Sequence, residues 1–269
     1  MKKVFAALLV LMLAVAMAGL ATAETADGSL QNILNKKTFI LGLDDSFPPM
    51  GFRNEDNDIV GFDIDVARAV CEKLGVELVV QPIAWDSKEL ELSSGNIDCI
   101  WNGMSITPER EESMAMTFAY LNNQMVFYTK TGAGIAVTAD LAGKKVAVQN
   151  GSYAEELLNG DYAELAATFG EVLGFDEYLT ALMDLQNGGC DAVLMDLVVG
   201  DYRINGMGAT DLEAAFALAD DNYGIGFRKT DLALRDKVQE ILIEMKKDGT
   251  LAEISSEWFG SDITVVPAE

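Results

Sequence analysis

Arg110 has the strongest chemical signal in this sequence. It stands three residues after Thr107, which can cap a helix whose first position is Pro108. A cation then falls in the first helical turn, where the helix dipole disfavours positive charge. Because a guanidinium matches a carboxylate with two parallel hydrogen bonds, Arg110 is a candidate for binding an anion. The alternative is a surface arginine paired with a neighbouring Glu109, Glu111 or Glu112.

A second candidate anion site lies at Gln149–Glu155. An apolar run ends there, Gly151 allows a tight turn, and Ser152 and Glu155 have the spacing of a capping box. The free N–H groups at the start of such a helix bind anions. The alternative is an ordinary capped helix without a ligand.

Two aspartates, Asp44 and Asp196, each follow an apolar run that reads as a strand. Ligands bind outside the carboxyl ends of strands in open α/β sheets, so either aspartate could meet an ammonium group or could instead cap a helix. Phe47 and Trp85 also lie just past predicted strand ends. There they could line a ligand pocket and offer π faces to a cation, or they could belong to the core.

These residues would be positioned by alternating strands and helices. Apolar runs predict strands at 39–43, 76–83, 97–101, 145–149, 192–195 and 223–227. Helical spacing and capping signals predict helices at 62–74, 153–158, 178–186 and 232–247. The strand at 97–101 is expected to run into a glycine-containing loop. Such alternation implies an α/β fold with mainly parallel sheets covered by helices, and its two halves of about 100 residues each suggest two lobes.

Composition narrows the range of functions. The 269 residues include 19 basic and 43 acidic side chains, and the net charge of −24 argues against binding nucleic acid or anionic membrane surfaces. The chain has no histidine, which excludes Ser-His-Asp and Cys-His catalysis and every metal site that uses histidine. We expect neither a metal nor a cofactor. The three cysteines, an odd number, are expected to be buried as small hydrophobic residues: Cys71, Cys99 and Cys190.

Residues 1–23 have the pattern of an export signal. Two lysines at positions 2 and 3 precede an unbroken run of apolar and small residues, and Ala21-Thr22-Ala23 fits the small-x-small cleavage pattern. A membrane anchor is the alternative, because the run is close to the ~18 residues that can span a bilayer. We expect cleavage after Ala23 and a soluble protein in the periplasm.

Six motifs in order closely resemble one family over essentially the whole chain after the signal. They are residues 41–50 (LGLDDSFPPM), 61–65 (GFDID), 102–110, 191–196, 223–227 (YGIGF) and 248–260. The sequence resembles the periplasmic polar amino-acid-binding proteins of ABC transporters, extracellular solute-binding protein family 3. The resemblance implies the two-lobe, type II periplasmic-binding-protein fold, in which each lobe is a mainly parallel sheet flanked by helices. Lobe 1 would comprise 24–121 and 223–269, and lobe 2 would comprise 122–222. The hinge would lie near two segments, 121–124 and 220–222.

The resemblance also implies how a ligand carboxylate is bound. Arg110 would clamp it, helped by the Ser105 hydroxyl and by backbone N–H groups near Ser152 and Tyr153. The family usually has a small Gly or Thr where Tyr153 stands, so this ring would narrow the pocket or add a hydroxyl group.

The rest of the ligand would meet the other candidates. By the resemblance, Asp196 would accept the α-ammonium group, with the Gly103 carbonyl as a second acceptor. Phe47 and Trp85 would hold the side chain between them. Its polar end would meet Asp44, with Asn102 and Gln149 as further candidates.

The expected function is therefore high-affinity binding of one free L-amino acid by lobe closure and its delivery to the permease of an ABC importer. The protein would be a monomer without enzymatic activity. Asp44, the two aromatic faces and the acidic composition favour arginine, lysine or histidine, then glutamine, then cystine. The alternatives are an enzyme of the same fold, similar to cyclohexadienyl dehydratase, in which Asp44 and Asp196 would form an acid/base pair, and a ligand-sensing domain that acts on a membrane receptor.

Overall fold

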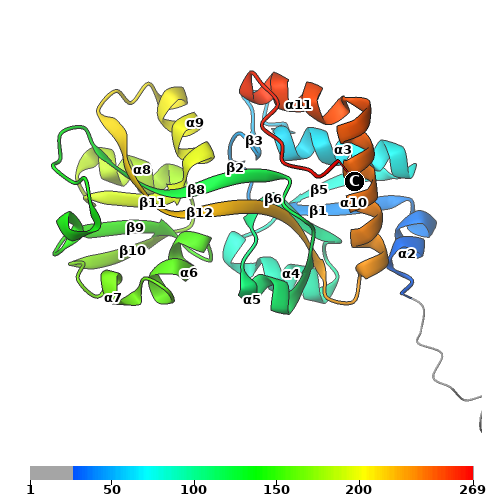
Figure 1. Ribbon diagram of the computed structural model, residues 1–269, viewed down its shortest axis with the longest axis horizontal. Coiled ribbons are helices and arrows are strands. Elements are labelled where there is room, and N and C mark those ends of the chain that lie inside the picture. Colours follow the sequence, from blue (N-terminus) through cyan, green and yellow to red (C-terminus); the bar gives the residue numbers. More distant parts are fainter. Residues whose placement is uncertain (1–26, 269) are drawn as a thin grey trace, which may run out of the picture.

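The computed structural model describes residues 27–268, so the predicted export signal at 1–23 lies outside the described residues. Two groups of elements stand side by side, and two long strands run between them (Figure 1). These strands, β8 (Leu121–Lys130) and β12 (Leu212–Arg228), pair antiparallel over most of their length. Within the part of the chain that is described, no helix is both long and apolar enough to cross a membrane.

A nine-stranded sheet passes through both groups in the order β10-β9-β11-β8-β12-β6-β1-β5, and β7 pairs with β12 outside that order. On one side of the crossing strands lies the β1 group. In it β1 (Thr38–Leu43) pairs in parallel with β5 (Glu77–Pro82) and β6 (Cys99–Ser105). Its other elements are β2 (Ser46–Phe47), β3 (Gly51–Arg53), β4 (Ile59–Val60), β7 (Met114–Met116), α2 (Ser29–Lys36), α3 (Phe62–Leu74), η1 (Trp85–Ser87), α4 (Lys88–Ser94), α5 (Pro108–Ser113), α10 (Leu232–Asp248) and α11 (Thr250–Phe259).

On the other side lies the β9 group. There β9 (Lys145–Gln149) pairs in parallel with β10 (Glu171–Phe175) and β11 (Ala192–Asp196), and β11 pairs antiparallel with β8. The remaining elements of this group are η2 (Thr138–Leu141), α6 (Tyr153–Asn159), α7 (Ala163–Ala166), α8 (Tyr178–Asn187) and α9 (Leu197–Met207). Within the nine-stranded sheet, every antiparallel pairing thus involves one of the two crossing strands. The strands β2, β3 and β4 form a separate, antiparallel sheet in the β1 group.

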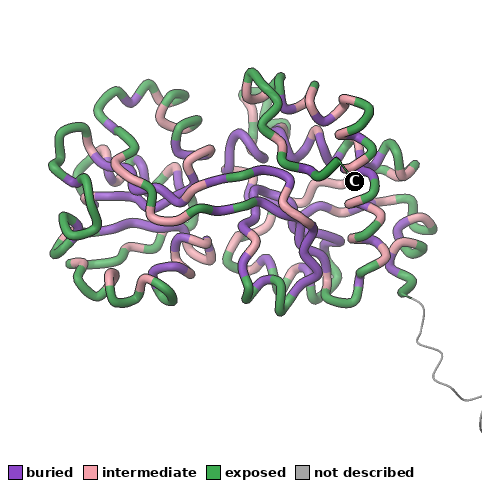
Figure 2. The backbone as a smooth tube through the Cα atoms, viewed as in Figure 1, coloured by how far each residue is buried: buried purple, intermediate pink, exposed green. Residues whose placement is uncertain are grey.

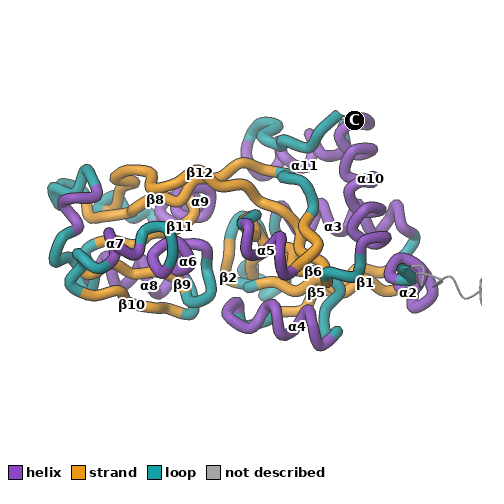
Figure 3. Tube along the Cα trace, turned by 60° about the horizontal axis from the view of Figure 1, so that its bottom comes forward, coloured by secondary structure: helices purple, strands orange, loops and turns teal. Residues whose placement is uncertain are grey.

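Helices cover both faces of the sheet in each group (Figure 3). The buried stretches of backbone follow the strands, whereas the outer helices and loops carry the exposed residues (Figure 2). One large apolar cluster joins α3, α8 and α10 to the sheet, and two smaller clusters lie beneath α6 and α4. All three cysteines are buried and unpaired, which confirms their prediction as small core residues.

The predicted helices are confirmed to within one residue at their ends, as α3, α6, α8 and α10. The strand predicted at 97–101 was misplaced, because β6 begins at Cys99 and continues through Gly103 to Ser105. Antiparallel pairing with β12, where Ser105 faces Tyr223, keeps the expected loop in the sheet. Likewise, 223–227 is only the end of β12, which the pairing with β8 extends back to Leu212.

The two chain segments expected near the hinge lie opposite each other in the crossing strands. Asn123 of β8 is in register with Asp221 of β12. Both strands continue through the boundaries given for the lobes, 121/122 and 222/223, and those boundaries stay a prediction.

Candidate functional site

Nine of the eleven candidate residues line one small cavity of about 10 Å³ between the β1 and β9 groups. They come from strands and from the first turns of helices in both groups and are Phe47, Trp85, Gly103, Ser105, Arg110, Gln149, Ser152, Tyr153 and Asp196. The other two, Asp44 and Asn102, lie next to this lining. The cavity therefore brings together residues that are up to 149 positions apart in the sequence.

Arg110 lies in the first turn of α5, as predicted, and is only 3% exposed. Its Nη1 donates to the Ser105 carbonyl at 2.9 Å, and its Nη2 donates to Glu156 Oε1 at 2.7 Å. Glu156 belongs to α6 of the β9 group, so this ion pair crosses between the groups, and none of the neighbouring glutamates holds Arg110. The buried Nε has no partner, so its N–H group is left unpaired.

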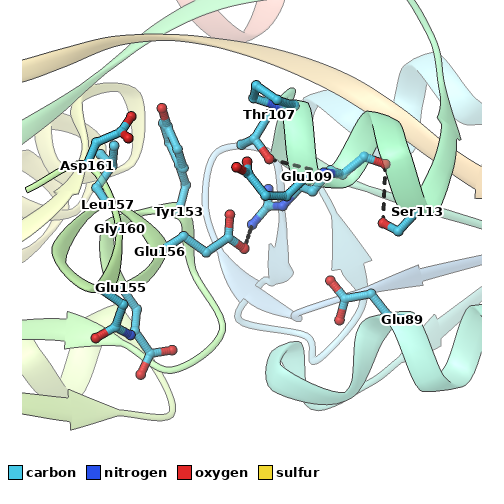
Figure 4. A pocket seen from close by; sticks show the side chains of 13 residues that line it. Glu89, Thr107, Glu109, Ser113, Tyr153, Glu155, Glu156, Leu157, Gly160 and Asp161 are labelled. Atoms are coloured by element: carbon cyan, nitrogen blue, oxygen red, sulfur yellow. Dashed lines mark hydrogen bonds and ion pairs between the residues drawn. The ribbon is translucent and has the colours of Figure 1, made fainter. Parts of the chain in front are cut away.

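Glu156 reaches Arg110 from the wall of a larger, open cavity of about 560 Å³ between α5 and α6. Figure 4 shows its carboxylate pointing across this space, with the Tyr153 ring beside it. Other acidic residues, among them Glu89, Glu109 and Asp161, line the same cavity. The cationic arginine thus lies between a small inner cavity and an acidic outer one.

Asp196 ends β11 and precedes α9, but its side chain does not cap that helix. Its Oδ1 accepts hydrogen bonds from Asn123 Nδ2 and from the Tyr223 hydroxyl, both at 2.8 Å. The same Asn123 Nδ2 also donates to Asp221 Oδ2 at 2.8 Å. One amide group therefore links two buried carboxylates.

Burial, followed by repulsion from Asp221, raises the pKa of Asp196 to about 7. Burial also raises the pKa of Asp221, although hydrogen bonds from Asn123 and Ser105 oppose the shift. A buried carboxylate in such surroundings is stabilised by any cation that reaches it. This pair of acids can accordingly accept an ammonium group.

Ser105 and Gly103, both in β6, have partners that the sequence did not predict. The Ser105 hydroxyl donates to Asp221 Oδ2 at 2.9 Å, so it is engaged beside the acids. Gly103 N donates to Asp63 Oδ2 at 2.7 Å. Gly103 has a φ of +58°, and a Cβ there would lie 2.9 Å from Phe47 Cε1 and 3.0 Å from Tyr223 Cε2, so only glycine lets both rings approach.

Asp44, which is bonded to the cavity residue Gln149, is 8% exposed and contacts both groups of elements. Its Oδ2 accepts from Gln149 Nε2 at 2.7 Å, and its Oδ1 accepts from Ser46 N at 2.8 Å. Burial raises the pKa of Asp44. Asn102 holds the Asp44 backbone, because Asn102 Oδ1 accepts a hydrogen bond from the Asp44 N–H at 3.0 Å. The buried Nδ2 of Asn102 has no partner.

The aromatic walls come from different elements. Phe47 of β2 is 6% exposed and packs against Tyr178 of α8, with the ring centroids 6.1 Å apart. Trp85 begins the short helix η1, is half-buried, and has Lys88 Nζ 5.0 Å from its ring centroid. Both rings line the small cavity and supply apolar walls to it.

The start of α6 is capped as predicted. Ser152 Oγ accepts from Glu155 N at 3.3 Å and donates to the Gln149 carbonyl at 2.7 Å. Glu155 does not return a bond to Ser152 N, because its Oε2 accepts from Gly151 N at 2.7 Å. Tyr153 is half-buried, and burial raises its pKa.

Several polar residues of the site were missed in the sequence. Lys88, Asn123, Glu156, Arg203 and Asp221 all contribute contacts in or around the cavity. Four of them have charged side chains, which the sequence pattern assigns to solvent-exposed positions. Only the folded arrangement of the two groups places these side chains near the cavity. Within residues 27–268, no group of three or more His, Cys, Asp or Glu residues could hold a metal ion.

Comparisons with known proteins agree on one family. A family model described as bacterial extracellular solute-binding proteins, family 3, matches residues 39–261. The L-cystine-binding protein TcyJ of Escherichia coli is 31% identical over 261 residues, which cover 96% of each chain. The L-arginine-binding protein of Pseudomonas aeruginosa is 31% identical over 246 residues, covering 87% of this chain and 93% of that protein.

Solved structures agree with the sequence comparisons. A substrate-binding protein of an ABC uptake transporter from Streptococcus pneumoniae, solved with bound histidine, has a TM-score of 0.86 at 36% identity and covers 90% of this chain and 99% of its own. An ancestral amino-acid-binding protein described as a precursor of cyclohexadienyl dehydratase has a TM-score of 0.78 at 28% identity, with 86% and 99% covered.

Proposed function

Because this chain belongs to family 3 of the bacterial extracellular solute-binding proteins, we propose that it binds a free polar amino acid and delivers it to an ABC import permease. The observation that carries the proposal is the inner cavity, which has a guanidinium at one wall and a carboxylate at another. A zwitterion is costly to desolvate, so a binding protein needs an opposite charge for each pole. Arg110 and Asp196 supply those two charges.

Arg110 is assigned to the α-carboxylate, together with the backbone N–H groups at the start of α6. Its buried Nε has no protein partner, and its Nη2 is held only by a Glu156 side chain that is 38% exposed. A ligand carboxylate can bond to Nε and share Nη2 or take it over. Asp196 is assigned to the α-ammonium group, with the Gly103 carbonyl as a second acceptor.

The side chain of the ligand would lie between Phe47 and Trp85 and point toward Asp44. Acidic residues predominate there, because Asp44 also lines a second cavity of about 330 Å³ together with Asp45, Asp86, Asp176 and Glu177. This charge favours a cationic side chain, and several relatives are described as arginine-binding proteins. We therefore place L-arginine first among the ligands, ahead of lysine, histidine, glutamine and cystine.

Ligand binding would bring the two groups of elements together, because the assigned residues come from both. The permease would then distinguish the closed, loaded protein from the empty one. We propose that the protein acts as a monomer in the periplasm after cleavage behind Ala23. The relatives named above are binding proteins, including the dehydratase precursor, and this supports binding without catalysis.

Thermal-shift screening with the twenty common amino acids, ornithine and cystine tests this function. A ligand that binds the native state raises the melting temperature in proportion to the logarithm of its concentration above Kd. We expect the largest rise with L-arginine and none with acidic amino acids. A melting temperature that no amino acid changes would contradict the proposed function.

A further inference from the structure

Lys88 is a buried cation that the proposed roles leave unexplained. It is the first residue of α4 and is only 2% exposed. Burial, followed by repulsion from Arg110, lowers its pKa. Since lysine is rarely buried without a partner, the contacts of its ammonium group indicate what it does.

The ammonium group reaches from the β1 group to the β9 group. Lys88 Nζ donates to the Gly151 carbonyl at 2.8 Å, across a sequence separation of 63 residues. Its other contacts are local and longer: the Trp85 carbonyl at 3.4 Å and Glu89 Oε1 at 3.3 Å. The same Nζ lies 5.0 Å from the centre of the Trp85 ring. The Lys88 ammonium group therefore contacts both Trp85 in the β1 group and Gly151 in the β9 group.

Gly151 gives a second, independent sign of close docking at this point. It has a φ of +69°, and a Cβ added there would lie 2.7 Å from Asp86 Cα. The turn thus rests directly on the backbone of η1, the segment that immediately precedes Lys88. Gly151 N is bound by Glu155 Oε2 at 2.7 Å, so both polar groups of the Gly151 backbone are fixed.

The next two residues, Ser152 and Tyr153, begin α6 and line the inner cavity with Arg110. We propose that Lys88 is a positioning residue for carboxylate recognition: by holding the Gly151 carbonyl, it presents the N-terminus of α6 to the anion that Arg110 binds. Lys88 also adds positive charge to that end of the site without touching the ligand. This inference rests on the proposed function.

Isothermal titration calorimetry with L-arginine and L-argininamide tests the proposal, because the amide lacks the carboxylate but keeps the other groups. Lys88→Met removes the ammonium group and keeps the length of the side chain. We expect the variant to lose about ten- to a hundredfold in affinity for L-arginine, the usual range for one charge-assisted hydrogen bond. The loss for L-argininamide should be at least fivefold smaller, so that the preference for acid over amide narrows.

Lys73→Met is the matched control. Lys73 lies in α3 and pairs with Glu244 and Asp248, away from the cavity, so the control should leave both affinities unchanged. Equal losses for the two ligands in Lys88→Met would mean general damage to the fold and would overturn the proposal, as would no loss. A wild-type protein that binds no amino acid would overturn the proposed function itself, and this inference with it.

Discussion

At the scale of single residues, the site consists of opposite charges that are buried and incompletely satisfied. Arg110 has a buried Nε without a partner, and the pKa of Asp196 is raised to about 7 by burial and by Asp221. A buried charge without a full complement of partners destabilises the empty protein and favours a ligand that completes it. We therefore expect these two residues to account for most of the preference for a zwitterionic ligand over one that lacks either charge.

Arg110→Ala should cost ~2–5 kcal/mol of binding free energy, because it leaves the ligand carboxylate buried without its ion pair. Calorimetry with L-arginine measures the change. Arg68→Ala is the control, since Arg68 is an arginine with a side chain 56% exposed that pairs with Asp65 on the surface of α3. Unaltered affinity in the Arg110 variant would refute its assignment to the carboxylate.

At the scale of elements, most of the candidate site residues stand at the end of a strand or the start of a helix. Ser152 shows how closely the two are linked, because its hydroxyl caps α6 and also binds the last residue of β9, Gln149. This arrangement holds the first turn of α6 against the sheet and beside Arg110.

Ser152→Ala should lower the free energy of unfolding by ~1 kcal/mol, the usual cost of losing an N-cap. It should also weaken binding of L-arginine, because α6 would lose its fixed position. Urea denaturation gives the first quantity and calorimetry the second. Ser256→Ala in α11, where an exposed hydroxyl donates only to the Ala252 carbonyl, should leave both nearly unchanged; a similar loss in that control would show that the effect is not specific to the cap.

Most elements could be predicted from the sequence because their signals are local. The helix α3 combines apolar spacing with Gly75 as its left-handed C-cap, and both signals lie within the segment itself. The crossing strand β8 was not predicted, since its first residues include the polar Asn122, Asn123 and Gln124. Those residues are held in the sheet by pairing with β12, about a hundred positions away, and no local pattern reveals such pairing.

Some residues of the candidate site could likewise be predicted from local sequence signals, and others could not. Arg110, Asp196 and Asp44 could be found because each stands at a recognisable end of an element. Lys88 and Glu156 could not, because their positions in α4 and α6 are typical of solvated helix faces, and only docking of the two groups places them at the cavity. Gln149 was found, but its bond to Asp44 depends on the same docking.

At the scale of the whole molecule, the acidic charge and the buried carboxylates make stability depend on pH. Burial raises the pKa of Asp63 and of Asp196 to about 7 from an ordinary value of 3.8. The folded protein therefore binds more protons than the unfolded chain between these values. The stability that these groups contribute is present below about pH 4 and is lost as the pH rises through 7.

The ligand-free protein should accordingly become less stable between about pH 4 and pH 7, and L-arginine should oppose the loss because its ammonium group compensates Asp196. Thermal unfolding across this range, with and without L-arginine, measures both effects. Asp196→Asn should flatten the ligand-free profile, since it removes one of the carboxyl groups whose pKa burial raises to about 7. A stability that rises steadily toward pH 7 without ligand would contradict the raised pKa values.

In the proposed function, Arg110 and Asp196 bind the carboxylate and the ammonium group of one amino acid. Calorimetry with L-arginine, agmatine and 5-guanidinopentanoate tests it most directly, because the second compound lacks only the carboxylate and the third only the ammonium group. We expect each analogue to bind at least about a hundredfold more weakly than L-arginine, since each leaves one buried charge unpaired. An analogue that binds as tightly as L-arginine would contradict the account.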